Sequence, residues 1–468
     1  MDFELPSIRR ILDKIQRDSY ALYGIDANEL LKIGGIKTRL SDHGISYDDF
    51  VKCYLIKNID RSTYEDGFDS LLAYYGRSAD FDDEDMNSFG AALHIDKTWQ
   101  RFAEIIEVLP HYPRSLETPT LYLRSAPIGD LSSRIIISHD RSEVAIVGDS
   151  SLYDLAKCLC DMFSVVTVEN QDNAFSIIPD PDRGSRFRDM YIGFSPTPDV
   201  VMPIFSATTW QTLQVDYARI PKGKYQNSAS NIMMDGLYAF VVGHEYAHFI
   251  QSAKNYTDSE LEEIALKNKA FLKGKWQEKY AEKFLWPDDE KIVSRFKNQA
   301  MEFFADFTSI DLIIGLNHIE KPSNRYSIDM DSYTYLYFLG VWIGFYIVLY
   351  RDRLTYLFET GDHWDEENMP FLARDYALHN LLSESDHPCI YSRIDSIVKQ
   401  ASKSSFLQQL NVSDSIYVAM GQSIETVSSY FDFCWAMGDY AKGKMKPTPH
   451  NLSPRIRYLR SQNNQVNY

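Results

Sequence analysis

The chain has 468 residues, of which 44% are hydrophobic and 14% aromatic, so it is long enough for two or three domains with sizeable cores. Its 48 basic and 66 acidic residues give a formal net charge of −18. This excess of negative charge argues against nucleic acid as a partner and against an anionic membrane surface. It is compatible with a protein or peptide substrate.

The chain contains five cysteines, scattered along its length, which is typical of a reduced cytoplasmic protein and not of a disulfide framework. Cys158 and Cys160 have no second pair of Cys or His nearby, so we expect both in the core. The N-terminus starts with a charged amphipathic pattern and has no apolar stretch of the signal-peptide type. A cytoplasmic location is therefore expected.

Residues 1–165 are expected to form a mixed α/β N-terminal domain. Its first 115 residues or so have mostly helical patterns, residues 118–147 have strand character broken by turn residues, and residues 152–163 have a helical pattern. This half contains no nucleotide-binding loop and no nucleophile elbow, so a recognition or regulatory role is the default expectation. Residues 200–206, further on, predict an edge strand, since a proline fits an edge better than a central strand.

The stretch VVGHEYAHFIQ, residues 241–251, contains an H-E-x-x-H motif made by His244, Glu245 and His248. Residues four apart on a helix lie on one face about a turn apart, so the two imidazoles can bind one zinc ion. Glu245 lies beside them and can act as a general base on a zinc-bound water. The surrounding pattern predicts an apolar helix whose start is capped by Asp235.

A second helical pattern begins near residue 287 and contains Glu302 and Asp306, which share a face. Glu302 would complete a His-His-Glu zinc site, and Asp306 could accept a hydrogen bond from the free ring N–H of a zinc-binding histidine. The alternatives are two histidines that share a core helix by accident and a solvated acidic face. The residues around the two acids are largely aromatic or aliphatic, however, and carboxylates in such surroundings usually have a charged or metal partner.

Residues 332–350 carry no charge over 19 positions, which is long enough to cross a bilayer. Five tyrosines and two glycines make this stretch less apolar than a typical membrane span. We favour a buried helix packed behind the zinc site, in which Gly340 and Gly344 allow close contact with another helix. A membrane-anchored protein is the alternative.

Residues 387–394 read H-P-x-x-x-x-R-I, with His387 and Arg393 at its two functional positions. Together with H-E-x-x-H and E-x-x-A-D, in this order, the motif resembles the gluzincin metallopeptidases, in particular the HtpX-like and CAAX-prenyl endopeptidase group. Bacterial proteases of the phage-exclusion type have similar zinc motifs. The resemblance covers about residues 202–396.

The resemblance implies that His387 helps to stabilise an oxyanion and that Arg393 pairs with Asp306. It also implies that the strand at residues 200–206 pairs with the backbone of a substrate. The corresponding fold class is α+β, with a mainly helical zincin-like domain over residues 166–400 that includes a small edge sheet. Residues 401–468 would form a C-terminal helical cap.

These features together predict a zinc-dependent endopeptidase that cleaves a protein substrate, with Zn²⁺ held by His244, His248 and Glu302 and with Glu245 as the general base. The alternative from another class is a catalytically silent zinc-binding scaffold whose N-terminal half binds a partner. Against it stands the intact Glu245, because a structural zinc site has no use for a general base. A further alternative is a membrane-anchored metalloprotease.

Overall fold

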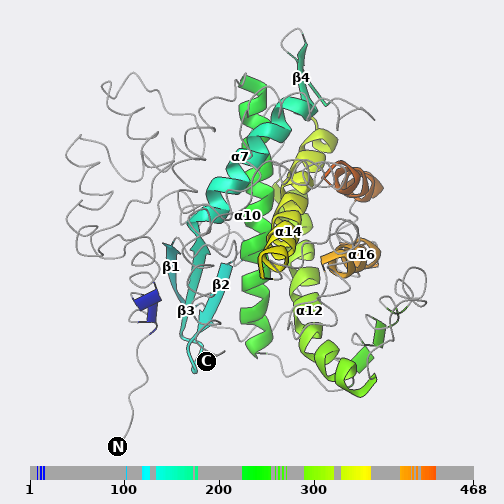
Figure 1. The fold of residues 1–468 in the computed structure, drawn as a ribbon. Helices are drawn as coiled ribbons and strands as arrows, with labels where there is room; N and C mark the ends of the chain where they lie inside the picture. Colours follow the sequence, from blue (N-terminus) through cyan, green and yellow to red (C-terminus); the bar gives the residue numbers. More distant parts are fainter. Residues whose placement is uncertain are drawn as a thin grey trace, which may run out of the picture. The chain divides into compact units, whose positions relative to one another are not determined.

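A computed structural model of the chain describes several separate stretches in detail (Figure 1). Apart from short pieces and single residues, these stretches are 119–126, 133–171, 174–177, 224–253, 289–320, 328–359, 390–401 and 413–427. The chain divides into two units. The first comprises Met1–Lys97, Glu117–Ser230 and Asp432–Tyr468, and the second comprises Thr98–Leu116 and Asn231–Phe431.

The strands predicted between residues 118 and 147 form one three-stranded sheet in the first unit. The strands are β1 (Thr120–Ala126), β2 (Ser133–Ile137) and β3 (Glu143–Asp149), in the order β1-β3-β2. β3 pairs with β1 in parallel and with β2 antiparallel. Because β3 is the central strand, nearly all of its residues are buried, and two of them, Ala145 and Val147, pack against Ile8 and Leu12.

Helix α7 (Ser150–Thr167) follows the sheet and confirms the helix predicted over residues 152–163. Cys160 is buried on this helix, as predicted, whereas the side chain of Cys158 lies outside the described residues. A short hairpin of β4 (Val168–Gln171) and β5 (Ala174–Ile177) comes next. Lys157 Nζ lies 2.9 Å from Asp161 Oδ1 and donates a hydrogen bond of 2.9 Å to Ser230 Oγ, so α7 is tied to the start of the following long helix.

The described part of the second unit consists of helices. They are α10 (Lys224–Ala253), which begins in the first unit, α12 (Asp289–Glu320), α14 (Met330–Glu359), α16 (Ile390–Ala401) and a further helix over residues 414–427. With the two small sheets, they confirm the predicted mainly helical α+β class. The domain boundaries at residues 165 and 400 stay predictions. The predicted edge strand at residues 200–206 lies outside the described residues.

The expectation that Asp235 caps the metal-site helix is wrong, because α10 begins at Lys224 and Asp235 lies inside it. The residues before Asp235 explain the difference. Ala229, Ile232 and Met233 are fully buried, so tertiary packing extends the helix beyond the local capping signal. The helix is therefore anchored for several turns before it reaches the histidines.

The uncharged stretch at residues 332–350 forms most of α14 and is a buried helix, as predicted. Leu336, Leu339, Val341, Trp342 and Ile343 are fully buried within the second unit. Trp342 donates a hydrogen bond of 3.0 Å to Ser423 Oγ, which satisfies its polar N–H in the interior. Among the helices that the structure describes, none combines the length and the hydropathy needed to span a bilayer.

Helices α10 and α14 approach each other so closely that each contributes a glycine to the crossing. A Cβ atom on Gly236 would overlap the carbonyl oxygen of Tyr337, and one on Gly340 would overlap the carbonyl oxygen of Met233. Gly344 is different, since a Cβ atom there would meet only the side chain of Leu237, with Cγ at 3.5 Å and Cδ1 at 3.8 Å, which are ordinary contacts. The predicted close helix contact is thus confirmed for Gly340, whereas Gly344 leaves room for a Cβ atom. The second glycine that the crossing requires is Gly236 on α10.

Because Gly340 and Gly344 differ in the space available for a Cβ atom, alanine substitutions at the two positions form a matched pair. Gly340→Ala should lower the free energy of unfolding by at least about 2–3 kcal/mol, because a rigid backbone must move to admit the methyl group. Gly344→Ala should leave it unchanged or raise it by up to about 1 kcal/mol, the usual gain of alanine over glycine inside a helix. Urea unfolding followed by circular dichroism measures both, and equal effects of the two variants would contradict the crossing described above.

Asp311 on α12 is a second notable acid of the second unit, and it lies away from the motifs. Ser404 Oγ donates a hydrogen bond of 3.0 Å to Asp311 Oδ2. Burial raises the pKa of Asp311 to about 6, and the hydrogen bond from Ser404 offsets only part of this effect. The folded chain therefore binds a proton at Asp311 more tightly than the unfolded chain does.

The sign of the resulting pH dependence follows from linkage. Stabilisation from the protonated carboxyl is fully present below the unfolded-state pKa and is lost as the pH rises through about 6. Relative to Asp311→Asn, the parent should therefore lose roughly 2 kcal/mol of unfolding free energy between about pH 4.5 and about pH 7.5. Urea titrations at both pH values test this. The exposed Glu263, changed to Gln, is the control, and the same pH dependence in both variants would contradict the assignment.

Candidate metal centre

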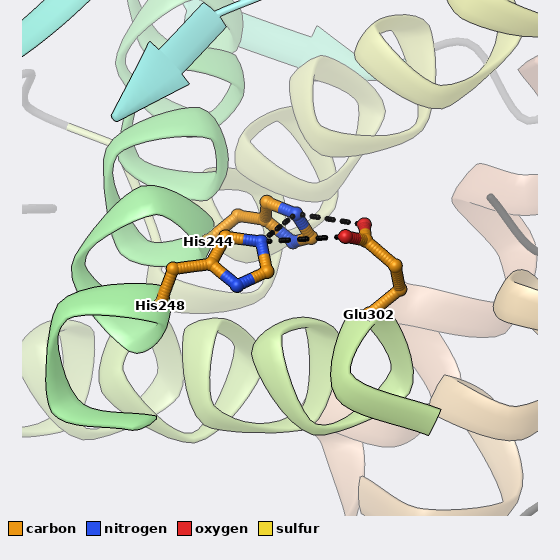
Figure 2. A group of neighbouring side chains, drawn as sticks. All are labelled: His244, His248 and Glu302. Atoms are coloured by element: carbon orange, nitrogen blue, oxygen red, sulfur yellow. Dashed lines mark hydrogen bonds and ion pairs between the residues drawn. The ribbon is translucent and has the colours of Figure 1, made fainter. Parts of the chain in front are cut away.

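Three side chains from two helices point toward one another in the second unit, as Figure 2 shows. His244 and His248 come from α10 and Glu302 comes from α12. The two Nε2 atoms are 3.1 Å apart, and Glu302 Oε2 and Oε1 lie 3.3 Å from His244 Nε2 and 3.5 Å from His248 Nε2. The group could hold a metal ion. The predicted convergence of these residues is therefore present.

Asp306 connects this group to a third helix. Its Oδ1 atom lies 3.0 Å from His244 Nδ1 and also accepts a hydrogen bond of 2.6 Å from Arg393 Nη2, while its Oδ2 atom accepts one of 2.7 Å from Arg393 Nε. Both contacts were predicted. An ionised carboxylate can only accept hydrogen bonds, so His244 donates to Asp306 from Nδ1 and turns Nε2 toward Glu302.

Arg393 is also supported by α14. Its guanidinium carbon lies 5.1 Å from the centre of the Phe345 ring, within the range of a cation–π contact. Phe345 in turn packs against Phe240, with ring centres 4.5 Å apart, and Phe240 belongs to the same helix face as His244. The sequence did not reveal this role of Phe345, because an aromatic residue in an apolar helix gives no sign of which partner it will face.

Close packing of α10 on α12 fixes the distance between the histidines and Glu302. Ser309 Oγ donates a hydrogen bond of 2.9 Å to the carbonyl oxygen of Phe240, one turn before His244. Gly243, directly before His244, leaves the space for this contact, because a Cβ atom there would lie 2.5 Å from Ser309 Oγ. The spacing of the two helices thus depends on a small residue beside the first histidine.

The charges of the site perturb the pKa values of its members in opposite directions. Burial lowers the pKa of His244, but its hydrogen bonds and charge interactions with Asp306 and Glu302 outweigh burial and raise that pKa to about 9. Burial and the neighbouring charge of His244 lower the pKa of His248. Burial raises the pKa of Asp306, but Arg393 and His244 outweigh it, so that this pKa is lowered.

The other two predicted site residues are placed less fully. Glu245 is 6% exposed and follows His244 directly on α10. His387 lies outside the described residues. One polar residue that contacts a histidine was not singled out from the sequence: Gln251 Oε1 lies 2.9 Å from His248 Nδ1. The sequence did hold a signal for this contact. Gln251 follows the apolar Phe249 and Ile250 on the helix, and a buried polar side chain usually has a hydrogen-bond partner.

The chain matches no family model, no curated protein and no solved structure. The resemblance to gluzincins therefore stays an expectation from the sequence motifs.

The pair of Arg393 and Asp306 gives a direct test of how the site is held. Asp306 is fully buried, so removing the guanidinium leaves an uncompensated charge, which typically costs ~3–5 kcal/mol. Arg393→Ala should lower the free energy of unfolding by about that amount in urea titrations at neutral pH. Lys399→Ala, at an exposed position of the same helix, should change it by less than about 1 kcal/mol. Equal stability of the two variants would contradict the buried pair.

Proposed function

We propose that the chain is a zinc-dependent endopeptidase that hydrolyses peptide bonds of a protein substrate. One observation carries the proposal: two imidazole nitrogens and a carboxylate converge from an H-E-x-x-H helix and a second helix. In such sites three protein ligands leave a fourth position open for chemistry. A zincin-like arrangement of the second unit is part of the proposal.

The distances among the three side chains are compatible with an ion of the size of zinc. For a tetrahedral ion with bonds of about 2.0–2.1 Å, any two ligand atoms lie about 3.3–3.4 Å apart. The two Nε2 atoms are 3.1 Å apart. Glu302 Oε2 lies 3.3 Å from His244 Nε2 and Glu302 Oε1 lies 3.5 Å from His248 Nε2, so the nitrogens face different oxygens of the carboxylate at distances near that edge length. Two nitrogen ligands and one carboxylate are also a combination that zinc accepts readily. His244, His248 and Glu302 would therefore hold the ion with little movement.

When bound, zinc would polarise the scissile carbonyl and lower the pKa of water at the site toward neutrality. The remaining steps belong to side chains. Asp306 keeps the Nδ1 proton of His244 in place and so presents its Nε2 lone pair to the site. Arg393 holds Asp306 through two hydrogen bonds, so the orientation of His244 does not depend on a single contact.

Glu245 would act as the general base. It is adjacent to His244 on the helix and therefore points about 100° away from it, which suits a residue that contacts water and not the ion. It would take a proton from the attacking water and deliver it to the leaving amine. By its resemblance to the gluzincin motif, His387 would donate a hydrogen bond to the developing oxyanion. Substrate selection would reside outside these motifs, with residues 1–165 as the candidate recognition region.

The test separates chemistry from metal binding. Glu245→Gln keeps the shape of the side chain but cannot accept a proton, so cleavage should fall about 10²–10⁴-fold while about one zinc per chain remains bound. Glu302→Ala is the matched comparison, and it should lose zinc as well as cleavage. Elemental analysis gives the zinc content, and mapping of new protein termini in cells that express each variant gives the cleavage.

Zinc content and cleavage also distinguish the proposal from its alternatives. New termini that appear equally with the parent and with Glu245→Gln would favour a zinc-binding scaffold that acts through a partner. Loss of zinc in Glu245→Gln would mean that Glu245 is a ligand and not the base. Retention of tightly bound zinc in Glu302→Ala would remove Glu302 from the ligand set.

A further inference from the structure

Gln251 makes two hydrogen bonds that link the two helices of the metal centre. It lies on α10 three residues after His248 and is 5% exposed. Its side-chain oxygen Oε1 is 2.9 Å from His248 Nδ1. Its side-chain nitrogen Nε2 donates a hydrogen bond of 2.8 Å to the carbonyl oxygen of Met301, which directly precedes Glu302 on α12.

These two contacts determine where the proton of His248 sits. A backbone carbonyl oxygen can only accept, so the amide nitrogen of Gln251 must face Met301. The amide oxygen of Gln251 must then face His248, and since this oxygen can only accept, His248 Nδ1 must be the donor. A neutral imidazole with its proton on Nδ1 has its lone pair on Nε2, the atom that lies nearest to His244 and Glu302.

We infer that Gln251 is a positioning residue for the metal centre, which fixes the Nδ1–H form of His248 and ties this ligand to the turn that carries Glu302. The inference rests on the proposed function for the role of the ion. The assignment of the proton to His248 Nδ1 does not need the ion, because it follows from hydrogen bonds within the protein.

Glutamine is suited to this position because both of its functions are needed. A carboxylate could accept from His248 but could not donate to the Met301 carbonyl, and an apolar side chain could do neither. The centre thus orients its two histidines differently. His244 is held by the charged Asp306 across the helix interface, and His248 is held by a neutral amide whose other end is fixed on that same second helix.

The experiment measures zinc affinity by competition with a chelating indicator, together with urea unfolding of the metal-free protein. Gln251→Met keeps the volume but removes both hydrogen bonds, and the affinity for zinc should fall about 10–100-fold. Gln251→Glu restores an acceptor for His248 but not the donor to Met301, so it should recover part of that affinity. Ser423→Ala is the control, because Ser423 is also fully buried and also makes two hydrogen bonds, to Trp342 and Met420.

The control separates positioning from stability. Ser423→Ala should lower the unfolding free energy by an amount similar to Gln251→Met but leave zinc affinity unchanged. Zinc affinity of Gln251→Met equal to that of the parent would overturn the inference.

A second measurement uses the metal-free parent protein with ¹⁵N-labelled histidine near pH 8. Long-range proton–nitrogen spectra should show that His248, assigned by its loss in His248→Ala, is protonated on Nδ1. A proton on Nε2 would overturn the role of Gln251 whether or not zinc binds. Failure of the parent to bind zinc, by contrast, would overturn the proposed function and not the assignment of this proton.

Discussion

The carboxylate of Asp306 is the group on which the metal centre depends. It is fully buried on α12, yet it contacts His244 on α10 and Arg393 on α16. An isolated carboxylate could not stay ionised in such a place, so its two partners must be present together with it. Three helices that are far apart in the sequence are thereby held at one point, and the position of the first histidine follows from that point.

Close backbone packing also fixes the position of α10, on one side against α14 and on another against α12. Gly236 and Gly340 let α10 and α14 approach until their backbones touch, and Gly243 lets α10 approach Ser309 on α12. At each of these positions a methyl group would meet an atom of the opposite helix. Interiors packed in this way resist small displacements, so the separation of the two histidines from Glu302 is rigid. Rigid ligands are what a preorganised metal site requires.

The sequence predicted those parts of the site that depend on spacing within one element. The i, i+4 pairs on α10 and α12 placed His244, His248, Glu302 and Asp306 on the correct faces, and runs of strand character separated by turn residues gave the strands of the first sheet. The parts that depend on packing between elements were missed or misplaced. The predicted start of α10 was wrong because buried contacts stabilise the helix before the residue that was expected to cap it.

The roles of Phe345 and Gln251 needed the structure for a related reason. The apolar composition of α14 is compatible with a membrane span or with a core helix, and only its neighbours decide between them. Likewise, a glutamine after an H-E-x-x-H motif has no visible partner until a carbonyl from another helix is placed beside it. Sequence patterns report what one element presents, whereas these residues act through what a second element supplies.

The charges of the site suggest how metal binding and folding are related. With a pKa of about 9, His244 is protonated at neutral pH, so the carboxylates of Asp306 and Glu302 are matched by His244 and Arg393. A metal ion held by this group would need the lone pair of His244 Nε2, so it would have to replace the proton there. The contact between His244 Nδ1 and Asp306 lies on the other side of the ring, so this exchange would not require Asp306 and Arg393 to move.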